Sequence, residues 1–386
     1  MPTPISLSRP DITAAERDLV AQVLHTPYLS MGPMVPRFEE LVARFVGTRH
    51  AVAVNSGTAG LHLALIAAGV GPGDYVVTTP FSFVSSANCI LYQGAIPAFV
   101  DIDPRTLNLD PDLLAARVQT LRDAGCPVKA LLPVHIFGQP CDMEAIMATA
   151  REHDLAVVED ACEALGAEVE GQQVGTFGHA AVLAFYPNKQ MTTGEGGMLL
   201  TDDDEWARLF RSLRNQGRDD ASTGLSAGDG TWLRHVRLGY NYRLPELSAA
   251  LGVAQMGRLD ELLHKRERVA AWYAEWLRGI AGVEAPYVSP RTTRMSWFVY
   301  VVRLLPGVDR EAVMDRLARQ GIPTRPYFPA IHLQPLYRER FGYREGDFPR
   351  TEDASRRTLA LPFHGNLGEA EVETVCRALE GALGKG

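Results

Sequence analysis

Short apolar runs alternate with helical patterns through the first two-thirds of the chain, and this alternation restricts the possible folds more than any other feature. The apolar runs lie at 51–54, 75–78, 95–102, 130–136, 155–160 and 180–186, and the helical patterns at 58–69, 84–93, 111–124 and 141–153. Strands joined by helical crossovers form largely parallel sheets, and strands that are apolar throughout are buried on both faces. The sequence therefore predicts an α/β fold, with a large domain whose mostly parallel sheet is sandwiched by helices.

The pattern changes after residue 215. Residues 217–232 are rich in Gly, Ser and Asp and predict a long exposed loop, and a long helix is expected from Pro245 to Arg278 because proline is tolerated at a helix start. A compact α+β unit should follow, with its elements at 296–305 (strand), 309–320 (helix), 322–327 (strand) and 368–383 (helix). We expect a large domain over 1–255 and a small C-terminal domain over 256–386.

Composition excludes several classes of protein. Of 386 residues, 46% are hydrophobic and 22% charged, which is typical of a folded globular chain. The net charge of −8 and the absence of a basic run argue against a nucleic-acid surface. No stretch approaches the ~20 apolar residues of a membrane span, and the first residues lack the pattern of a signal peptide. The five cysteines are widely spaced, which predicts reduced thiols in a cytoplasmic protein, and no metal-ligand spacing occurs.

Only four of the 38 basic residues are lysines: Lys129, Lys189, Lys265 and Lys385. A GC-rich genome explains the scarcity, but Lys189 stands apart because it follows a strand that ends at Pro187 and precedes a glycine cluster at 194–197. An amine in a desolvated pocket has a lowered pKa and can form a Schiff base. The alternative is an ordinary surface-loop lysine.

A second candidate is the strand–turn–helix at 51–65. Small residues (Ser56, Gly57, Thr58, Ala59) lie where the helix begins, so a phosphate could approach the free N–H groups and the positive end of the helix dipole. The alternative is plain N-capping by Asn55 or Ser56.

A third candidate is Asp160, which ends the apolar strand at 155–160. In a parallel sheet, ligands bind at the carboxyl ends of the strands, so this carboxylate is expected to face a ligand. The alternative is a helix N-cap, with Glu163 completing a capping box.

Together these features match the needs of pyridoxal 5′-phosphate (PLP). The helix start would hold the phosphate, Lys189 would form the Schiff base, and Asp160 would pair with the pyridine nitrogen so that the ring acts as an electron sink. Phe81 and Phe83 are available to stack on the ring.

The chain resembles the DegT/StrS-type aminotransferases, which have the aspartate aminotransferase fold (fold type I) and act on nucleotide-linked keto-sugars. The resemblance covers nearly the whole chain and is carried by segments such as NSGTAGLHLAL, GVGPGDYVVTTPFSFVSSAN, VVEDACEALGA, FYPNKQMTTGEGG and GYNYRLPELSAALG.

The resemblance implies a role for each matching residue. The cofactor residues would be Lys189 (Schiff base), Asp160 (pyridine nitrogen), Gly57, Thr58 and Ala59 (phosphate), Phe83 (stacking) and Glu163 (near the ring hydroxyl). Asn241 would reach the cofactor phosphate of the neighbouring subunit, which implies a homodimer with shared active sites, and His332 would lie near the substrate sugar.

Two positions depart from the family pattern. Ala184 stands where a serine usually donates to the phosphate, which removes a hydrogen bond worth roughly 0.5–1.5 kcal/mol. Glu163 stands where Gln or His is usual, and a carboxylate there would repel the cofactor phenolate unless it is protonated.

The predicted function is a ping-pong transamination from L-glutamate to the keto group of a nucleotide-linked sugar. One alternative is a sugar 3-dehydratase of the same family, but those enzymes carry His in place of the lysine. A cyclitol ketone is an alternative acceptor. A non-catalytic PLP-binding regulator would need a DNA-binding module, which the acidic sequence does not show.

Overall fold

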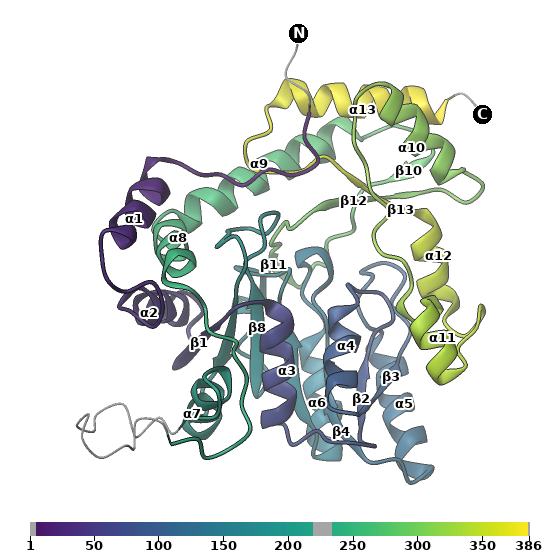
Figure 1. The fold of residues 1–386 in the computed structure, drawn as a ribbon. Coiled ribbons are helices and arrows are strands. Elements are labelled where there is room, and N and C mark those ends of the chain that lie inside the picture. The colour runs from purple at the N-terminus through teal and green to yellow at the C-terminus, as the bar shows by residue number, and fades with distance from the viewer. Residues whose placement is uncertain (1–4, 219–233, 385–386) are drawn as a thin grey trace.

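The computed structural model describes residues 5–218 and 234–384, so most of the predicted loop at 217–232 lies outside the described residues. Its central feature is a seven-stranded sheet (Figure 1), whose spatial order is β1 (His50–Val54), β9 (Gly197–Thr201), β8 (Ala180–Ala184), β5 (Ala156–Asp160), β4 (Val128–Leu131), β2 (Tyr75–Thr78) and β3 (Ile96–Phe99). β9 runs in the direction opposite to that of the other six strands of this sheet. The predicted α/β class with a mostly parallel sheet is confirmed.

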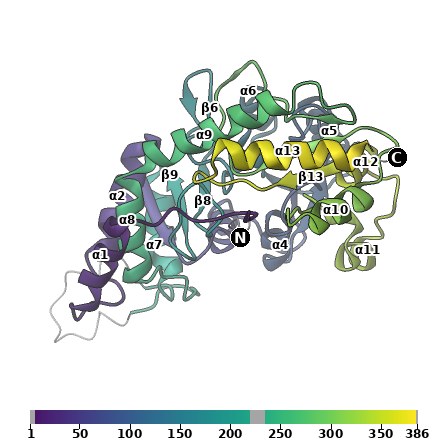
Figure 2. The ribbon, with the colours of Figure 1, turned by 90° about the horizontal axis from the view of Figure 1, so that it is seen from above.

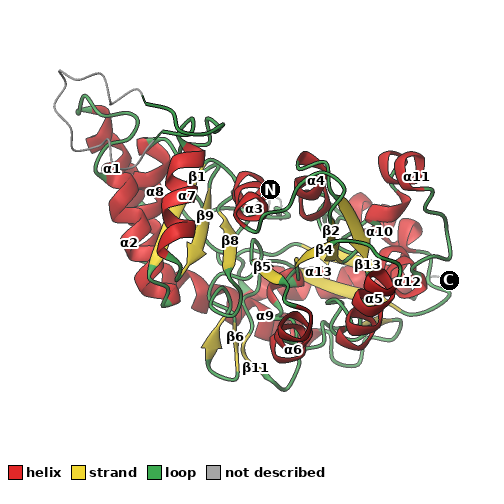
Figure 3. Ribbon diagram, turned by 90° about the horizontal axis from the view of Figure 1, so that it is seen from below, coloured by secondary structure: helices red, strands yellow, loops and turns green. Residues whose placement is uncertain are grey.

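Helices cover both faces of this sheet, as Figure 3 shows. One face carries α3 (Gly57–Ala67), α4 (Ser85–Tyr92) and α7 (Asp204–Arg214), and the other carries α2 (Met34–Val46), α5 (Pro111–Asp123) and α6 (Met143–His153). In β1, Val52 and Val54 pack in the core on the α3 side, while Ala51 and Ala53 pack on the α2 side. Burial on both faces explains why the strands are apolar without alternation.

A second, antiparallel sheet lies in the C-terminal part of the chain and consists of β10 (Val283–Glu284), β12 (Tyr300–Leu304) and β13 (Thr358–Leu361). It packs against α9 (Leu259–Trp276), α10 (Arg310–Arg319) and α13 (Glu369–Leu383), and Figure 2 shows α9 and α13 running side by side above the rest. This is the expected α+β unit. The proposed boundary between 255 and 256 stays a prediction.

The remaining elements connect these two units. They are α1 (Ala14–Leu24), α8 (Glu246–Met256), α11 (Pro335–Phe341), α12 (Pro349–Arg357) and a small sheet of β11 (Thr292–Arg294), β6 (Glu168–Val169) and β7 (Gln172–Gln173). The first described residues join the C-terminal unit, because Phe363 N donates to the Leu7 carbonyl (2.8 Å). Within residues 5–218 and 234–384, no helix combines the length and apolar character that crossing a membrane requires.

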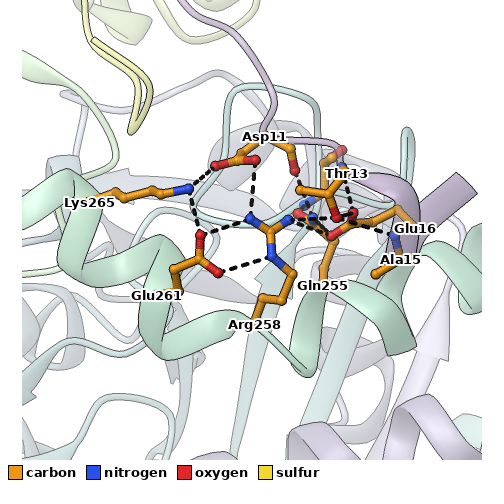
Figure 4. A network of polar contacts seen from close by, with 9 residues as sticks. Asp11, Thr13, Ala15, Glu16, Gln255, Arg258, Glu261 and Lys265 are labelled. Atoms are coloured by element: carbon orange, nitrogen blue, oxygen red, sulfur yellow. Dashed lines mark hydrogen bonds and ion pairs between the residues drawn. The ribbon is translucent and has the colours of Figure 1, made fainter. Parts of the chain in front are cut away.

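The single long helix expected from Pro245 to Arg278 is wrong. Pro245 lies in extended backbone before α8, and the path breaks at Gly257 and Arg258, so that α8 packs on α1 and α2 whereas α9 packs on α13. Glycine weakens a helix interior. In the break, the Arg258 guanidinium donates to Glu16 (2.9 Å) and Asp11 (3.3 Å), as Figure 4 shows.

The strand expected near 322–327 is also wrong, because that segment makes only an isolated bridge between Arg325 and Ala360. The chain uses β13 instead, and hydrogen bonds in both directions join Arg325 to Ala360 at the edge of that strand. The elements that were not expected from the sequence are the helices α1, α2, α7, α11 and α12 and the strands β6, β7, β9, β10, β11 and β13.

Candidate active site

A cavity of about 490 Å³ opens where β5 and β8 end, between the large sheet and residues of the C-terminal unit. Six of the predicted site residues line it: Gly57, Thr58, Phe83, Asp160, Glu163 and Lys189. Phe298, Tyr327 and Phe328 close the cavity from the other side. Residues from four separate segments next to the large sheet therefore meet at this cavity, as the position of the strand ends predicted.

The start of α3 forms one wall of the cavity. Ser56 is extended and its Oγ accepts a hydrogen bond from Ala59 N (3.1 Å), so the predicted N-cap is present. Ala59 itself is buried and is not among the lining residues. A Cβ on Gly57 would lie 2.8 Å from both Ala184 Cβ and Cys162 Sγ. Glycine thus lets the helix start approach the strand ends, and the first-turn N–H groups could hold an anion there.

Asp160 ends β5 and is 3% exposed. Its Oδ2 accepts a hydrogen bond from Ser86 Oγ (2.7 Å), which also contacts Ser82 Oγ (2.8 Å), and its Oδ1 accepts one from Cys162 N (3.2 Å). Residues 161–167 are turns, so the alternative of a helix cap is wrong. The carboxylate is held in a fixed orientation at the cavity wall.

Lys189 follows β8 in an irregular loop, and its side chain is 12% exposed. Its Nζ lies 3.6 Å from Glu163 Oε1 and 3.7 Å from the centre of the Phe298 ring. Its carbonyl accepts a hydrogen bond from Arg266 Nη2 (2.6 Å). Lys189 is therefore a partly buried cavity lysine, and the surface-loop alternative is wrong.

Glu163 lies beside this amine and not in a capping box. Its Oε2 accepts a hydrogen bond from Phe137 N (2.9 Å). Burial raises the pKa of Glu163 above its ordinary value, and the nearby Lys189 and the Phe137 N–H group oppose that rise only in part. A carboxyl with a raised pKa at a cavity wall is a common property of acid–base sites.

The structure separates the two candidate stacking residues. Phe83 lines the cavity and is 59% exposed, whereas Phe81 is fully buried and packs on Phe137 and Phe328. Phe83 is thus available to a ligand ring and Phe81 is part of the core.

Two predicted residues lie away from the cavity of their own chain. Asn241 is exposed near the end of β1, where its carbonyl accepts a hydrogen bond from Asn55 Nδ2 (3.5 Å). His332 is fully buried and its Nε2 lies 3.1 Å from Glu352 Oε1. Neither is among the lining residues, so their roles stay predictions.

Several site residues were missed by sequence reasoning: Ser86, Tyr186, Phe298, Tyr327 and, behind the lysine, Arg266. Ser86 lies in the quoted segment after Phe83, one helical turn beyond Ser82, and that spacing was an available signal. Phe298 and Arg266 lie 109 and 77 residues from Lys189, and nothing local in the sequence connects them to it.

Comparisons with known proteins agree with this geometry. The profile of the DegT/DnrJ/EryC1/StrS aminotransferase family matches residues 10–380. Spore coat polysaccharide biosynthesis protein SpsC of Bacillus subtilis (strain 168) is 41% identical over 377 residues, which cover 96% of this chain and 95% of that protein. GDP-perosamine synthase of Caulobacter vibrioides is 40% identical over 383 residues, 98% of each chain.

Among solved structures, the putative sugar aminotransferase Spr1654 from Streptococcus pneumoniae in its PMP form has a TM-score of 0.91 at 26% identity, with 99% of both chains covered. A PLP form of the same protein matches with a TM-score of 0.90 at 25% identity.

The fold and the cavity define a PLP-dependent aminotransferase, because a lysine, a strand-end aspartate and an open helix start meet at one wall. The chain belongs to the DegT/DnrJ/EryC1/StrS aminotransferase family.

Proposed function

We propose that the protein transfers the amino group of L-glutamate to the keto group of a nucleotide-linked sugar, in amino-sugar and polysaccharide biosynthesis. The observation that carries this proposal is the convergence of Lys189, Asp160 and the start of α3 on one cavity. The similarity to SpsC and to GDP-perosamine synthase supports the class of acceptor and the type of pathway.

Each side chain has a role that follows from its position. The N–H groups of Gly57 and Thr58 and the Thr58 hydroxyl would hold the cofactor phosphate, and Phe83 would cover the ring. Asp160, fixed by Ser86, would accept a hydrogen bond from the protonated pyridine nitrogen.

When bound, PLP supplies an electron sink for the electron pair released at the α-carbon of the amino donor. Lys189 would move the proton, because its Nζ is the amine at the cavity wall and its backbone is held by Arg266. Phe298, Tyr327 and Phe328 close the opposite wall and would limit the access of water.

We also propose a homodimer with shared active sites. Asn241 is exposed near the end of β1, next to the start of α3, so its side chain could reach another subunit. Apolar side chains in the adjoining segments are exposed: Leu29 at 52%, Met31 at 54% and Leu238 at 83%. The segment of Leu29 joins the start of α8 through a hydrogen bond from Glu246 N to the Leu29 carbonyl (3.1 Å). Such exposed groups of apolar residues are typical of protein interfaces.

A cytoplasmic location is part of the same proposal. All five cysteines are free thiols, and three of them are buried. Free thiols persist in a reducing compartment, which is where a glutamate-dependent biosynthetic enzyme would work.

The test follows the absorbance of the PLP-loaded protein. L-glutamate should bleach the PLP band, and addition of a nucleotide keto-sugar from a panel should restore it with release of an amino-sugar identified by mass spectrometry. Lys189→Ala is the matched control and should show no turnover. No bleaching would favour a passive binder, and restoration only by a cyclitol ketone would replace the proposed acceptor.

A further inference from the structure

Two glutamates near the end of β5 are buried with different numbers of partners. The Glu159 carboxylate is fully buried and accepts four hydrogen bonds, from His135 Nε2 (3.2 Å) and from the backbone N–H groups of Gly175, Phe177 and Gly178 (2.8 Å each). Because Cys141 N donates to His135 Nδ1, the other ring nitrogen carries the hydrogen that Glu159 accepts. Four donors thus satisfy the hydrogen-bonding capacity of this buried carboxylate.

Glu163 has a weaker set of partners. The structure gives its carboxylate one backbone donor, Phe137 N, and the amine of Lys189 at 3.6 Å. That separation exceeds the 2.7–3.2 Å of ordinary N–H···O hydrogen bonds. The Glu163 carboxylate is therefore close enough to exchange a proton with the amine, and it accepts fewer hydrogen bonds than the Glu159 carboxylate.

The surroundings of Lys189 combine one carboxylate with one aromatic ring. The face of the Phe298 ring, 3.7 Å from Nζ, stabilises an ammonium ion. Burial of both groups disfavours the separated charges and so favours the neutral amine with a neutral carboxylic acid. The pair can thus exist in two forms that differ only in the position of one proton.

We propose that Glu163 and Lys189 share a single proton, and that Glu163 takes it when Lys189 acts as a neutral amine. In this step an N–H bond of Lys189 Nζ breaks and leaves its electron pair on nitrogen, while an O–H bond forms at Glu163 Oε1. Both charges disappear and no other reactant is needed. The catalytic use of this step rests on the proposed function, since a neutral amine is needed both to attack a carbonyl carbon and to accept a proton.

Other ionisable groups face the pair from several elements. Asp160 and Cys162 lie on the same segment as Glu163, and burial raises the pKa of the Cys162 thiol well above its usual range. From the C-terminal unit, Tyr327 has a pKa raised by burial and by the Glu163 charge. The Tyr186 and Glu195 side chains also line the cavity, and Arg266 donates to the Lys189 carbonyl.

The test measures the acetylation rate of each lysine in the full-length, cofactor-free chain across a pH range, with acetic anhydride as probe and peptide mass spectrometry as readout. The exposed Lys129 serves as internal reference. In the wild type, the fraction of neutral amine in the shared-proton form should give Lys189 a plateau of intermediate reactivity before a second rise at alkaline pH.

In Glu163→Gln the plateau should vanish, and a single rise should occur about 1 pH unit or more below the second wild-type rise, because the counter-charge is gone. A single-step wild-type profile would overturn the proposal, whether its midpoint matches that of the variant or lies above it. The wild-type profile is decisive by itself if the variant fails to fold. Since neither cofactor nor substrate is present, a failed transamination assay leaves this result intact.

Lys265 provides the matched control pair. Its Nζ contacts Asp11 Oδ2 (2.7 Å) and Glu261 Oε1 (2.6 Å), as Figure 4 shows. Lys265 is not among the residues that line the cavity. Glu261→Gln should shift the acetylation profile of Lys265 to lower pH and leave that of Lys189 unchanged. Glu163→Gln should change the profile of Lys189 as described above and leave that of Lys265 unchanged. A shift of both lysines in either variant would mean a global change and would overturn the local interpretation.

Discussion

Lys189 and Lys265 both face carboxylates, yet their surroundings differ in how completely the charge is paired. Lys265 contacts two carboxylates within 2.7 Å, and Arg258 also pairs with both of them. These hydrogen bonds raise the pKa of Lys265. Lys189 has one carboxylate at 3.6 Å and an aromatic ring, and it faces a cavity. A lysine that must react needs incomplete pairing, whereas a structural lysine is held by complete pairing.

The largest effect is expected from Lys189→Arg. Arginine keeps the positive charge beside Glu163 but cannot form the covalent bond to the cofactor or give up its proton. Turnover should fall by more than about 10³-fold while the fold remains. Steady-state transamination rates, with circular dichroism as the check on folding, test this. Retention of multiple turnovers in this variant would contradict the proposed catalytic role of Lys189.

A second test concerns Arg266, the neighbour of Lys265 on α9. Its buried guanidinium donates to four carbonyls, those of Asn188, Lys189, Trp297 and Phe298, and burial lowers its pKa to about 10. Arg266→Met should lower the free energy of unfolding by about 3 kcal/mol, because the carbonyls lose their donor.

Urea unfolding measures this loss. The control is Arg44→Met, since Arg44 is 72% exposed and pairs only with Glu40 in the described structure. That change should stay within about 0.5 kcal/mol. Equal losses in both variants would show that the link between α9 and the Lys189 loop is not stabilising.

The hydrogen-bond network that joins Lys265, Arg258 and Glu16 should make the free energy of unfolding depend on pH in acid. Burial alone would raise the pKa of Glu16, but hydrogen bonds from Thr13, Gln255 and Arg258 outweigh it and lower the pKa from 4.5 to about 2. A lowered pKa in the folded chain means that stability is complete above about pH 4.5 and is lost as the pH falls towards 2. Unfolding free energies between these values should fall less steeply in Glu16→Gln, and an identical slope would contradict the assignment.

The smallest effect is expected from Lys265→Arg. A guanidinium can pair with Asp11 and Glu261 as the ammonium does, so stability should change by no more than about 0.5 kcal/mol and the transamination rate should stay the same. A loss of activity close to that of Lys189→Arg would break the contrast between the two lysines.

The elements that could be predicted from the sequence are those with strong local signals. The strand at 75–78 coincides with β2, and the helix expected at 111–124 begins at Pro111 after its Asp110 cap, as α5 does. The strand β9 was missed because its apolar run directly follows the glycine cluster. A Cβ on Gly197 would lie 2.6 Å from the Ser56 carbonyl carbon and oxygen, so that glycine reflects a contact with a distant segment and not a loop.

The candidate site was predictable to the same extent. Asp160 ends β5 and Lys189 follows β8, and these two strands are adjacent and parallel. The rule that ligands bind at strand ends was therefore sufficient to place both residues at one cavity. The break between α8 and α9 was not predictable, because Gly257 alone is a weak signal and each half packs on a different partner.

The sequence by itself singled out Lys189 as the candidate reactive amine, since strand, proline and glycine signals lie on either side of it. Only the tertiary structure decided what surrounds that amine: Glu163 at 3.6 Å, the Phe298 ring, and Arg266, which donates a hydrogen bond to the Lys189 carbonyl. Local patterns reflect backbone preferences over a few residues. The charge state of a buried amine depends instead on desolvation and on partners brought from distant segments by packing.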